Sequence, residues 1–452
     1  MNKFALTTIP PVFGLVLFAA SPTSANPIPP AVQDSDYYFN GAPDEDVVKL
    51  GKRLFFDKIL SGNGNISCAT CHHPLTETGD GLSLPVGEGG AGLGTARNTG
   101  TGSDAIHERV PRNSPPLFNL GAKSMTHMFH DGRIFVDQGE PSGFVNPAGN
   151  DLPTGLDNVL AAQAMFPVTS ATEMAGQPGE NDIADAVDAG DLAGPNGVWA
   201  LLANRLKSVP KYVDLFYEAY GVSANDITFV LAANAIAAYE TETFRSDDSP
   251  FDRYLRGDTD AMSPLAINGM NLFYGSAGCS DCHSGAFQTD MSFHGIAMPQ
   301  VGPGKGDGAS GHEDFGRKNV SGLNRDKFAF RTPPLRNVEV TAPYGHAGAY
   351  PTLRQVIKHH EQPIASLEGY ECDKKPRLPS RTDLDVVDCF VMNDPTLVQK
   401  IANKNDLDPQ ELSKSDIDAL IAFLESLTDS SALDLRRKVP NKPPPSGLPL
   451  AD

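Results

Sequence analysis

Tryptophan, cysteine and positive charge are all scarce in this chain of 452 residues. It contains one tryptophan and six cysteines, and its 36 lysine and arginine residues are outnumbered by 56 aspartate and glutamate residues, which gives a formal charge of −20. So acidic a chain is a poor candidate for nucleic-acid binding, which depends on neutralising phosphates. Its acidic surface suits docking of a basic protein, although acidity also serves solubility alone.

Long apolar runs are missing after the N-terminus. Residues 1–25 carry one lysine, an apolar core and small residues before Asn26, which is the pattern of a cleaved secretory signal peptide. An uncleaved anchor is the alternative. No later segment has the roughly eighteen apolar residues that a membrane span requires. We therefore expect an exported protein without a membrane span.

Four of the six cysteines lie in two copies of one motif, C-x-x-C-H, at residues 68–72 and 279–283. Thiols three residues apart share one face of a helical turn and can bind both vinyl groups of one porphyrin, while the next imidazole ligates the iron. Zinc half-sites or redox cysteine pairs are the alternative. We favour two covalently bound haem c groups. The attachment residues are Cys68, Cys71, Cys279 and Cys282, and the proximal ligands are His72 and His283.

Cys372 and Cys389 remain once the motif cysteines are assigned. In an oxidising compartment two such cysteines can close the polar loop between them. The sequence therefore predicts a disulfide.

Helical periodicity dominates the chain, and strand-like alternation is scarce. Glycine-rich loops are expected at 78–101 and 302–316. The fold class is therefore mainly α. Helices are predicted at 44–56, 155–165, 198–209, 210–220, 226–244, 263–274, 352–360 and 415–427.

One order of features occurs twice: a helix, Leu-Phe-Phe or Leu-Phe-Tyr, a short loop, C-x-x-C-H and a long irregular segment. This repetition predicts a duplicated haem module. We expect an N-terminal haem domain at 26–222 and a C-terminal haem domain at 223–435, whose final helix could pack back on the first domain. A proline-rich tail follows at 436–452.

Several longer motifs make the chain resemble the bacterial di-haem cytochrome c peroxidases, the superfamily that includes MauG. The resemblance covers nearly the whole chain after the leader. The motifs are LGKRLFFD (50–57), RNSP (112–115), DGR (131–133), SPFDRY (249–254), FRTPPLRN (330–337) and TAPYGH (341–346).

The resemblance implies two class I cytochrome c-like haem domains with long irregular loops. It makes the His72 haem the peroxide-binding one and the His283 haem the electron-entry one. Its catalytic distal residues match Gln163, Pro167 and Glu173 here. A single carboxylate such as Glu173 can take a proton from one peroxide oxygen and return it to the other, although a helix-capping role is the plain alternative.

The chain departs from the family at the second axial ligand of the electron-entry haem. Where the family has Met or Tyr, this chain has His360, with His359 beside it. Bis-imidazole coordination lacks the thioether that stabilises ferrous iron, so we expect a low potential. Met298 and Met291 are the other candidate ligands.

Two further departures bear on activity. The loop at 79–97, where many relatives carry a histidine that blocks the peroxide haem, contains none, and His107 is the nearest candidate. His130 stands where the family has the tryptophan between the haems. The single tryptophan, Trp199, is expected in the core, so the inter-haem route is left to direct tunnelling, Phe129 or Tyr344.

The resemblance also implies a calcium ion between the haems. Asn113, Thr341 and Pro343 match the family's ligands, and hard oxygen donors suit calcium. The family often forms homodimers as well.

These features lead to one principal function and two alternatives. The principal reading is a periplasmic peroxidase that reduces hydrogen peroxide to water with electrons from a small donor protein such as a cytochrome c or cupredoxin. A MauG-like oxidase would instead use peroxide to oxidise an aromatic residue of a partner protein. A non-catalytic di-haem electron carrier is the third possibility, against which Glu173 argues.

Overall fold

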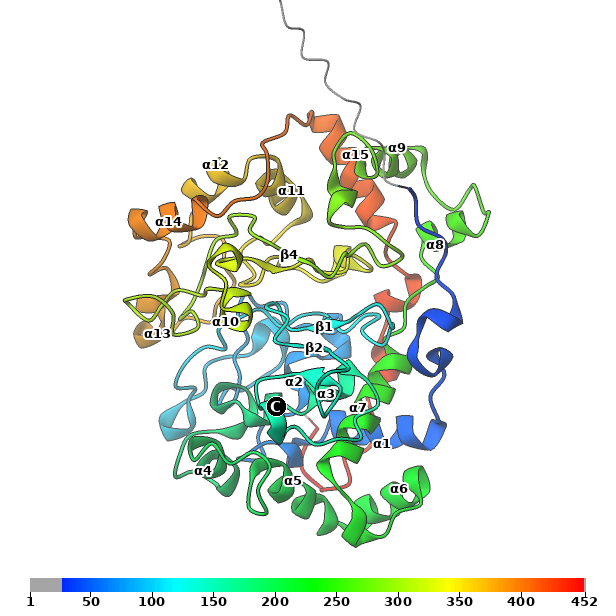
Figure 1. The fold of residues 1–452 in the computed structure, drawn as a ribbon, viewed down its shortest axis with the longest axis vertical. Helices are drawn as coiled ribbons and strands as arrows, with labels where there is room; N and C mark the ends of the chain where they lie inside the picture. Colours follow the sequence, from blue (N-terminus) through cyan, green and yellow to red (C-terminus); the bar gives the residue numbers. More distant parts are fainter. Residues whose placement is uncertain (1–26, 451–452) are drawn as a thin grey trace, which may run out of the picture.

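The computed structural model describes residues 27–450, so the predicted signal peptide lies outside the described residues. The fold is mainly α, and irregular chain connects its helices (Figure 1). Two small antiparallel sheets are present. One consists of β1 (His127–Met128), β2 (Ile134–Val136) and β3 (Phe144–Val145), and the other of β4 (Phe293–His294) and β5 (Phe330–Arg331). No described helix has the length and apolar character needed to cross a bilayer.

Eight helices occur where the sequence predicts them, with ends that differ by up to four residues. They are α1 (Glu45–Phe55), α3 (Val159–Ala164), α5 (Val198–Lys207), α6 (Pro210–Tyr220), α7 (Phe229–Thr243), α9 (Pro264–Phe273), α11 (Leu353–Glu361) and α15 (Lys414–Glu425).

The sequence reading missed several short elements, because they span too few residues to show a period. They are α2 (Cys68–Cys71), α4 (Asp182–Asp188), α8 (Pro250–Leu255), α10 (Lys318–Ser321), α12 (Pro363–Glu368), α13 (Thr382–Asp388), α14 (Pro395–Ala402), β1 (His127–Met128), β2 (Ile134–Val136), β3 (Phe144–Val145), β4 (Phe293–His294) and β5 (Phe330–Arg331).

The molecule has two halves stacked along its long axis (Figure 1). In the N-terminal half, α1 begins where the Asp44 side chain accepts the backbone N–H of Asp46 at 3.0 Å. Helix α1 packs against α7 with no room for a side chain at Gly51, where a Cβ would lie 1.8 Å from the carbonyl oxygen of Ala235. The two helices therefore cross in backbone contact.

The C-terminal half repeats this helix crossing. A Cβ on Gly269 of α9 would lie 1.9 Å from the carbonyl oxygen of Ala419 in α15. The next neighbours also correspond. A Cβ placed on Gly51 would lie 2.9 Å from the Cβ of Tyr239, and one placed on Gly269 would lie 2.9 Å from the Cβ of Phe423. Each half thus has a helix preceding its C-x-x-C-H motif that crosses a later helix at a glycine.

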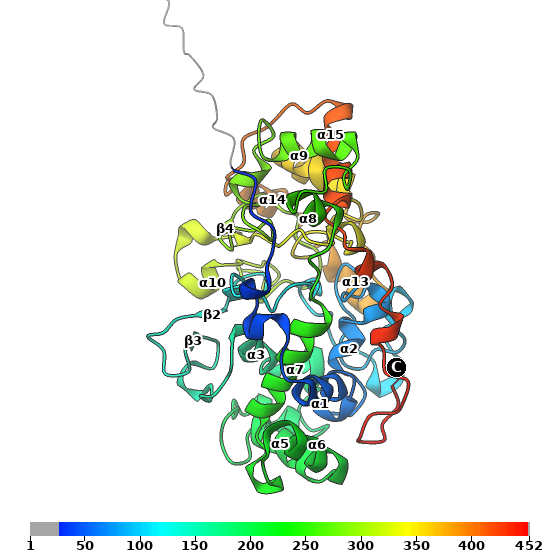
Figure 2. The same ribbon diagram turned by 90° about the vertical axis from the view of Figure 1, so that its right-hand side faces the viewer.

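The chain does not divide cleanly between the halves. Helix α7 follows Val222, yet its buried residues belong to the same apolar core as α1. The final helix α15 packs on α9, and the segment after it returns to the first core, where Ala432 and Leu435 are buried. Near the C-terminus the Ser446 hydroxyl donates to Asp57 at 2.6 Å, beside the end of α1 (Figure 2). The cystine Cys372–Cys389 is present as predicted.

Candidate haem sites

The first C-x-x-C-H motif folds as the one-turn helix α2, followed by His72. Because α2 is helical, Cys68 and Cys71 lie on one face of the turn, and neither forms a disulfide. The Nδ1 of His72 lies 3.0 Å from the carbonyl oxygen of Thr78, an acceptor that makes Nδ1 the protonated nitrogen. The Nε2 atom is then the one that can ligate a metal.

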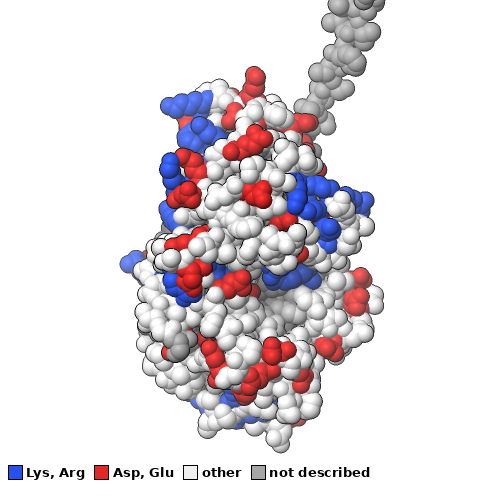
Figure 3. Space-filling view, turned by 90° about the vertical axis from the view of Figure 1, so that its left-hand side faces the viewer, with Lys and Arg blue, Asp and Glu red and all other residues white. Residues whose placement is uncertain are grey.

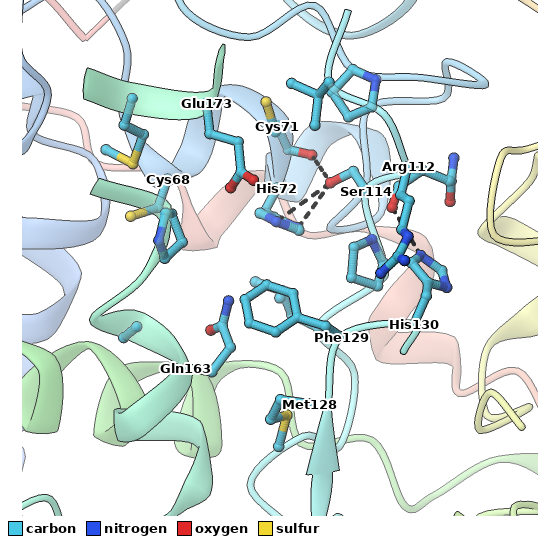
Figure 4. A pocket seen from close by; sticks show the side chains of 18 of the residues that line it. Cys68, Cys71, His72, Arg112, Ser114, Met128, Phe129, His130, Gln163 and Glu173 are labelled. Carbon is cyan, nitrogen blue, oxygen red and sulfur yellow. Dashed lines mark hydrogen bonds between the residues drawn. The ribbon is translucent and has the colours of Figure 1, made fainter. Parts of the chain in front are cut away.

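A cavity with about 1260 Å³ of empty space, including its opening to solvent, lies beside this motif. The close-up shows side chains from separate segments converging on it, with Glu173 and Gln163 directed into the same space as the His72 ring (Figure 4). The cavity brings together all six residues predicted for the first haem. They are Cys68, Cys71, His72, Gln163, Pro167 and Glu173.

Backbone conformation explains how Gln163, Pro167 and Glu173 come to line the cavity. Gln163 lies in the last turn of α3, and Pro167, which cannot donate a helical hydrogen bond, starts a 3-10 turn just beyond it. Glu173 then sits in a π-helical turn, Ala171–Ala175. Such turns are rare and are frequent at functional sites.

Burial and two positively charged side chains govern the electrostatics of Glu173. Burial raises the pKa of its carboxyl group, while the positive charges of Arg133 and Lys305 oppose that rise. Lys305 comes from the loop at 302–316, so the C-terminal half contributes to the cavity of the N-terminal half.

Buried ion pairs neutralise two of the cations on the cavity wall. Arg112 lies 2.6 Å from Asp131 and 2.7 Å from Asp314, and Arg133 lies 3.2 Å from Asp131. Two guanidinium groups therefore share two carboxylates. The buried Arg112 holds the pKa of both aspartates below its usual value, against the opposing effect of their burial.

Arg331 is a buried cation without such compensation. It is 8% exposed, lines the cavity and forms no ion pair with a carboxylate among residues 27–450. Its side chain donates to the carbonyl oxygens of Phe129 and Thr332. An unpaired guanidinium in a mostly apolar cavity fits a group that is apolar in its body and carboxylated at its edge, as haem is. The residues around this cavity fit haem c.

Glu240 of α7 is a further cavity residue that the sequence reading missed. Burial raises the pKa of its carboxyl group to about 8, so the group is mostly neutral at pH 7. Its Oε2 atom is buried without a hydrogen-bond partner among the described residues. The sequence signal was weak, because Glu240 is one acidic residue in an otherwise apolar helix.

The second motif is held in the same way. Its cysteines form no disulfide, and the Nδ1 of His283 lies 3.1 Å from the carbonyl oxygen of Gln288. Opposite it, the Nδ1 of His360 lies 2.8 Å from the carbonyl oxygen of Val356, and the two imidazole centroids are 6.5 Å apart. If both rings bound one metal ion between them, two metal–nitrogen bonds of about 2 Å each, plus the distance from each nitrogen to its ring centroid, would give roughly this separation. The pair fits two axial ligands of one haem iron.

The other candidate ligands have other contacts. His359 has both ring nitrogens engaged, at 3.0 Å from the Tyr350 hydroxyl and 2.7 Å from the carbonyl oxygen of Ile296. The Met291 sulfur accepts a hydrogen bond from Arg331 at 3.5 Å. Met298 is buried in a core cluster and contacts Gly345.

A small pocket lies near the residues predicted for calcium. Asn113, Thr341 and Ala342 line it together with Asp80, whereas Pro343 is not among its lining residues. The Asn113 amide donates to the carbonyl oxygens at 82 and 83, which leaves its own oxygen available. The Asp80 Oδ2 atom is buried without a partner among the described residues, and burial raises the pKa of Asp80 to about 7. These oxygens fit a hard cation.

The remaining predicted residues are placed as follows. His107 is exposed and does not line the cavity. His130 does line it, and its Nε2 lies 3.0 Å from the carbonyl oxygen of Asn113. Trp199 is buried at 4% exposure in the first core, as predicted.

The two motifs, the repeated helix crossings and the large cavity on one side define a di-haem c-type oxidoreductase. The chain belongs to the di-haem cytochrome c peroxidase family, whose model matches residues 45–260. It is 31% identical over 380 residues to the methylamine utilization protein MauG of Methylorubrum extorquens, covering 84% of this chain and 77% of that protein. It is 32% identical over 334 residues to the cytochrome c551 peroxidase of Pseudomonas aeruginosa, covering 73% and 75%.

Solved structures share the fold. A MauG-like protein associated with microbial copper homeostasis superposes with a TM-score of 0.55 at 24% identity, covering 94% of this chain and 97% of that one. The diheme peroxidase BthA of Burkholderia thailandensis gives 0.56 at 20% identity, covering 92% of each chain. The family membership makes this protein an oxidoreductase of the cytochrome c peroxidase type, and the family implies two haem c groups.

Proposed function

We propose that the protein reduces hydrogen peroxide to water at the His72 site, with electrons that a small donor protein delivers through the His283 site. The observation that carries this proposal is the unequal surroundings of the two histidines. A cavity with Glu173 and Gln163 adjoins His72, whereas His360 faces His283 at a ring separation of 6.5 Å. One site is built to admit a small molecule and the other to exclude it.

Each residue of the first site has a task in this reaction. Haem, when bound through Cys68 and Cys71, supplies the iron that exchanges electrons with peroxide. The carbonyl of Thr78 holds the His72 ring by its Nδ1. The Glu173 carboxylate takes the proton from one peroxide oxygen and returns it to the departing one, so that water leaves.

Gln163 and Pro167 prepare the space in which Glu173 acts. The Gln163 amide can orient peroxide by a hydrogen bond, and Pro167 ends α3 so that this amide reaches the cavity. Met128 and Phe129 on the cavity wall exclude bulk water (Figure 4).

The second site is proposed as a closed, bis-imidazole electron-entry centre. The Nδ1 contacts of His283 and His360 leave both Nε2 atoms for iron, and His359 is occupied elsewhere. Two imidazole ligands favour ferric iron more than a Met/His pair does, so this centre has a low potential.

Each half is proposed as a class I cytochrome c-like haem domain. The glycine crossings of α1 with α7 and of α9 with α15 support this division. The expected boundary near Val222 then needs one adjustment, since α7 belongs with the first core. Calcium between the halves, held by Asn113, Thr341 and Pro343, is part of the same proposal, and the oxygen-lined pocket that Asn113 and Thr341 share supports two of these three ligands. Export to the periplasm and a homodimer belong to the same proposal.

A MauG-like oxidase of an aromatic residue in a partner protein is the second candidate. The absence of any histidine from the described cavity wall besides His72 and His130 favours it, since His107 is exposed. His130 in place of a relay tryptophan counts against it, because imidazole is much harder to oxidise than indole. A plain electron carrier has no use for the Glu173 cavity.

One experiment separates these functions. The oxidised holoprotein is mixed with peroxide alone and then with reduced cytochrome c, and both chromophores are followed by stopped-flow absorbance. Rapid oxidation of the donor supports the peroxidase. A long-lived oxidised species with slow donor turnover supports the protein oxidase, and no spectral change supports the carrier.

A further inference from the structure

The mouth of the peroxide cavity is completed by the C-terminal half. Lys305, in the glycine-rich loop at 302–316, lines the same cavity as Glu173. Its loop is fixed rather than loose: the Lys305 N–H donates to the carbonyl oxygen of Glu313 at 3.1 Å, and Asp307 and Glu313 pair through both backbone bonds. Gly304 allows this turn, because a Cβ there would lie 2.2 Å from the carbonyl oxygen of His312.

Lys305 stands out because it forms no direct ion pair among the described residues, although the charges of Asp314 and Glu173 act on it. Arg112 and Arg133 share Asp131 and Asp314, as described above. The Lys305 ammonium has no hydrogen-bond or ion-pair partner within residues 27–450. On one face of the molecule, basic side chains lie along the upper edge of a hollow between the two halves, with acidic side chains beside them (Figure 3). An ammonium group without an ion pair, close to two guanidinium groups, is unfavourable unless a negative charge nearby attracts it.

Two carboxylates act on the charge of Lys305, and Asp314 is already paired with Arg112, so Glu173 is the one left for Lys305 to stabilise. Besides the neutral Glu240, it is the one carboxyl group on the described cavity wall. We propose that Lys305 of the C-terminal half is the counter-ion that holds Glu173 of the N-terminal half as a carboxylate, ready to accept a proton. The inference rests on the proposed role of Glu173, and it makes Lys305 a positioning residue. The other titratable or charged side chains around this cavity are His72, Arg112, His130, Arg133, Glu240 and Arg331.

The electrostatics of both partners agree with this pairing. Burial raises the pKa of Glu173, and Arg133 and Lys305 are the charges that lower it. Burial, Arg133 and Arg112 lower the pKa of Lys305, whereas Asp314 and Glu173 raise it. Removing the Lys305 charge therefore lets the pKa of Glu173 rise further. The carboxylate is then lost at a higher pH than in the wild-type protein.

Cyanide binding to the ferric holoprotein tests this without turnover. Below pH 8 the probe is hydrogen cyanide, which must give its proton to a base as the cyanide ion binds, so the association rate falls as the base becomes protonated. In Lys305→Met we expect the pH of half-maximal rate to rise by about one unit. The rate well above that pH should be unchanged. Lys305→Arg should restore the wild-type profile, and Lys414→Met, an exposed lysine far from the cavity, should not alter it.

Glu173→Gln identifies the titrating group. In that variant the pH-dependent limb should disappear, and adding Lys305→Met should then change nothing. A wild-type profile in Lys305→Met, equal shifts in the Met and Arg variants, or a limb that persists in Glu173→Gln would each overturn the inference. Peroxide turnover of the wild-type holoprotein is measured separately. A failure of that assay with an intact cyanide shift would reject the proposed function and leave the Lys305–Glu173 pairing standing.

Discussion

The two haem sites share their proximal side and differ on the opposite side. His72 and His283 each follow a C-x-x-C pair and each place Nδ1 at 3.0 or 3.1 Å from a backbone carbonyl oxygen. Opposite His72 there is a cavity with a carboxyl group, and opposite His283 there is a second imidazole. In the proposed function the attachment motif therefore prepares a ligand, while the chain folded over the other face decides between chemistry and electron transfer.

The largest expected effect is on the carboxyl group that sets the first site apart. Glu173→Gln removes the proton acceptor and keeps the shape of the side chain. We expect peroxide turnover to fall by about 10²–10⁴-fold, the range of general acid–base catalysis. Both haem spectra should be unchanged. Steady-state oxidation of reduced cytochrome c measures the effect, and turnover equal to wild type would remove Glu173 from the mechanism.

The glycine crossings test whether the two halves are equivalent units. Gly51→Ala and Gly269→Ala each push a methyl group into a backbone carbonyl, at 1.8 and 1.9 Å. Each should lower the free energy of unfolding by about 3 kcal/mol, the upper end of overpacking costs. Hydrogen exchange should show the loss mainly in the half that carries the change. Equal loosening of both halves by either variant would mean that they unfold as one unit.

The axial ligand of the second site can be exchanged for the family's thioether. His360→Met should raise the potential of that haem by on the order of 100 mV, because thioether ligation favours ferrous iron. The oxidised spectrum should gain a charge-transfer band typical of Met ligation. His359→Gln is the matched control and should leave the potential unchanged. A wild-type spectrum in His360→Met would show that another residue ligates the iron.

The smallest expected effect concerns the buried acid of the first site. The folded-state pKa of Glu240 is about 8, above the usual value near 4.3, so the folded protein holds a proton that the unfolded chain releases between these values. Stability from this group is therefore lost as pH rises from about 4.5 to 8. Glu240→Gln should raise the free energy of unfolding at pH 7.5 by about 1–2 kcal/mol and flatten its pH dependence. Denaturant unfolding at pH 5 and 7.5 measures this, and an equal change at both values would contradict it.

Much of the fold could be predicted from the sequence, because its signals are local. The amphipathic helices at 44–56 and 263–274 show a helical period, and both were found. The sheet of β1–β3 was missed, because strands of two or three residues are too short to alternate. The membership of α7 in the first core was missed as well, because its apolar surface is continuous and does not say which core it joins.

The candidate site divides in the same way. Glu173 and Gln163 were predicted through a family resemblance rather than through any pattern of their own. Lys305 carries no sequence signal, since one lysine in a glycine-rich loop is ordinary, and Arg331 stood out only as one letter of the FRTPPLRN motif (330–337), which gave it no role of its own. Their importance follows from the fold, which leaves each of these two cations beside the cavity without a direct ion pair among the described residues.

The sequence by itself determined the two C-x-x-C-H motifs and so the predicted attachment points of two haem groups, because that chemistry needs only the spacing within one helical turn. Tertiary structure decided what faces those histidines. His359 and His360 are neighbours in sequence, yet one residue rotates a helix by about 100°. Packing of α11 therefore directs His360 toward His283 and His359 toward Tyr350. Only the folding of distant segments onto one another could make the two haem sites different.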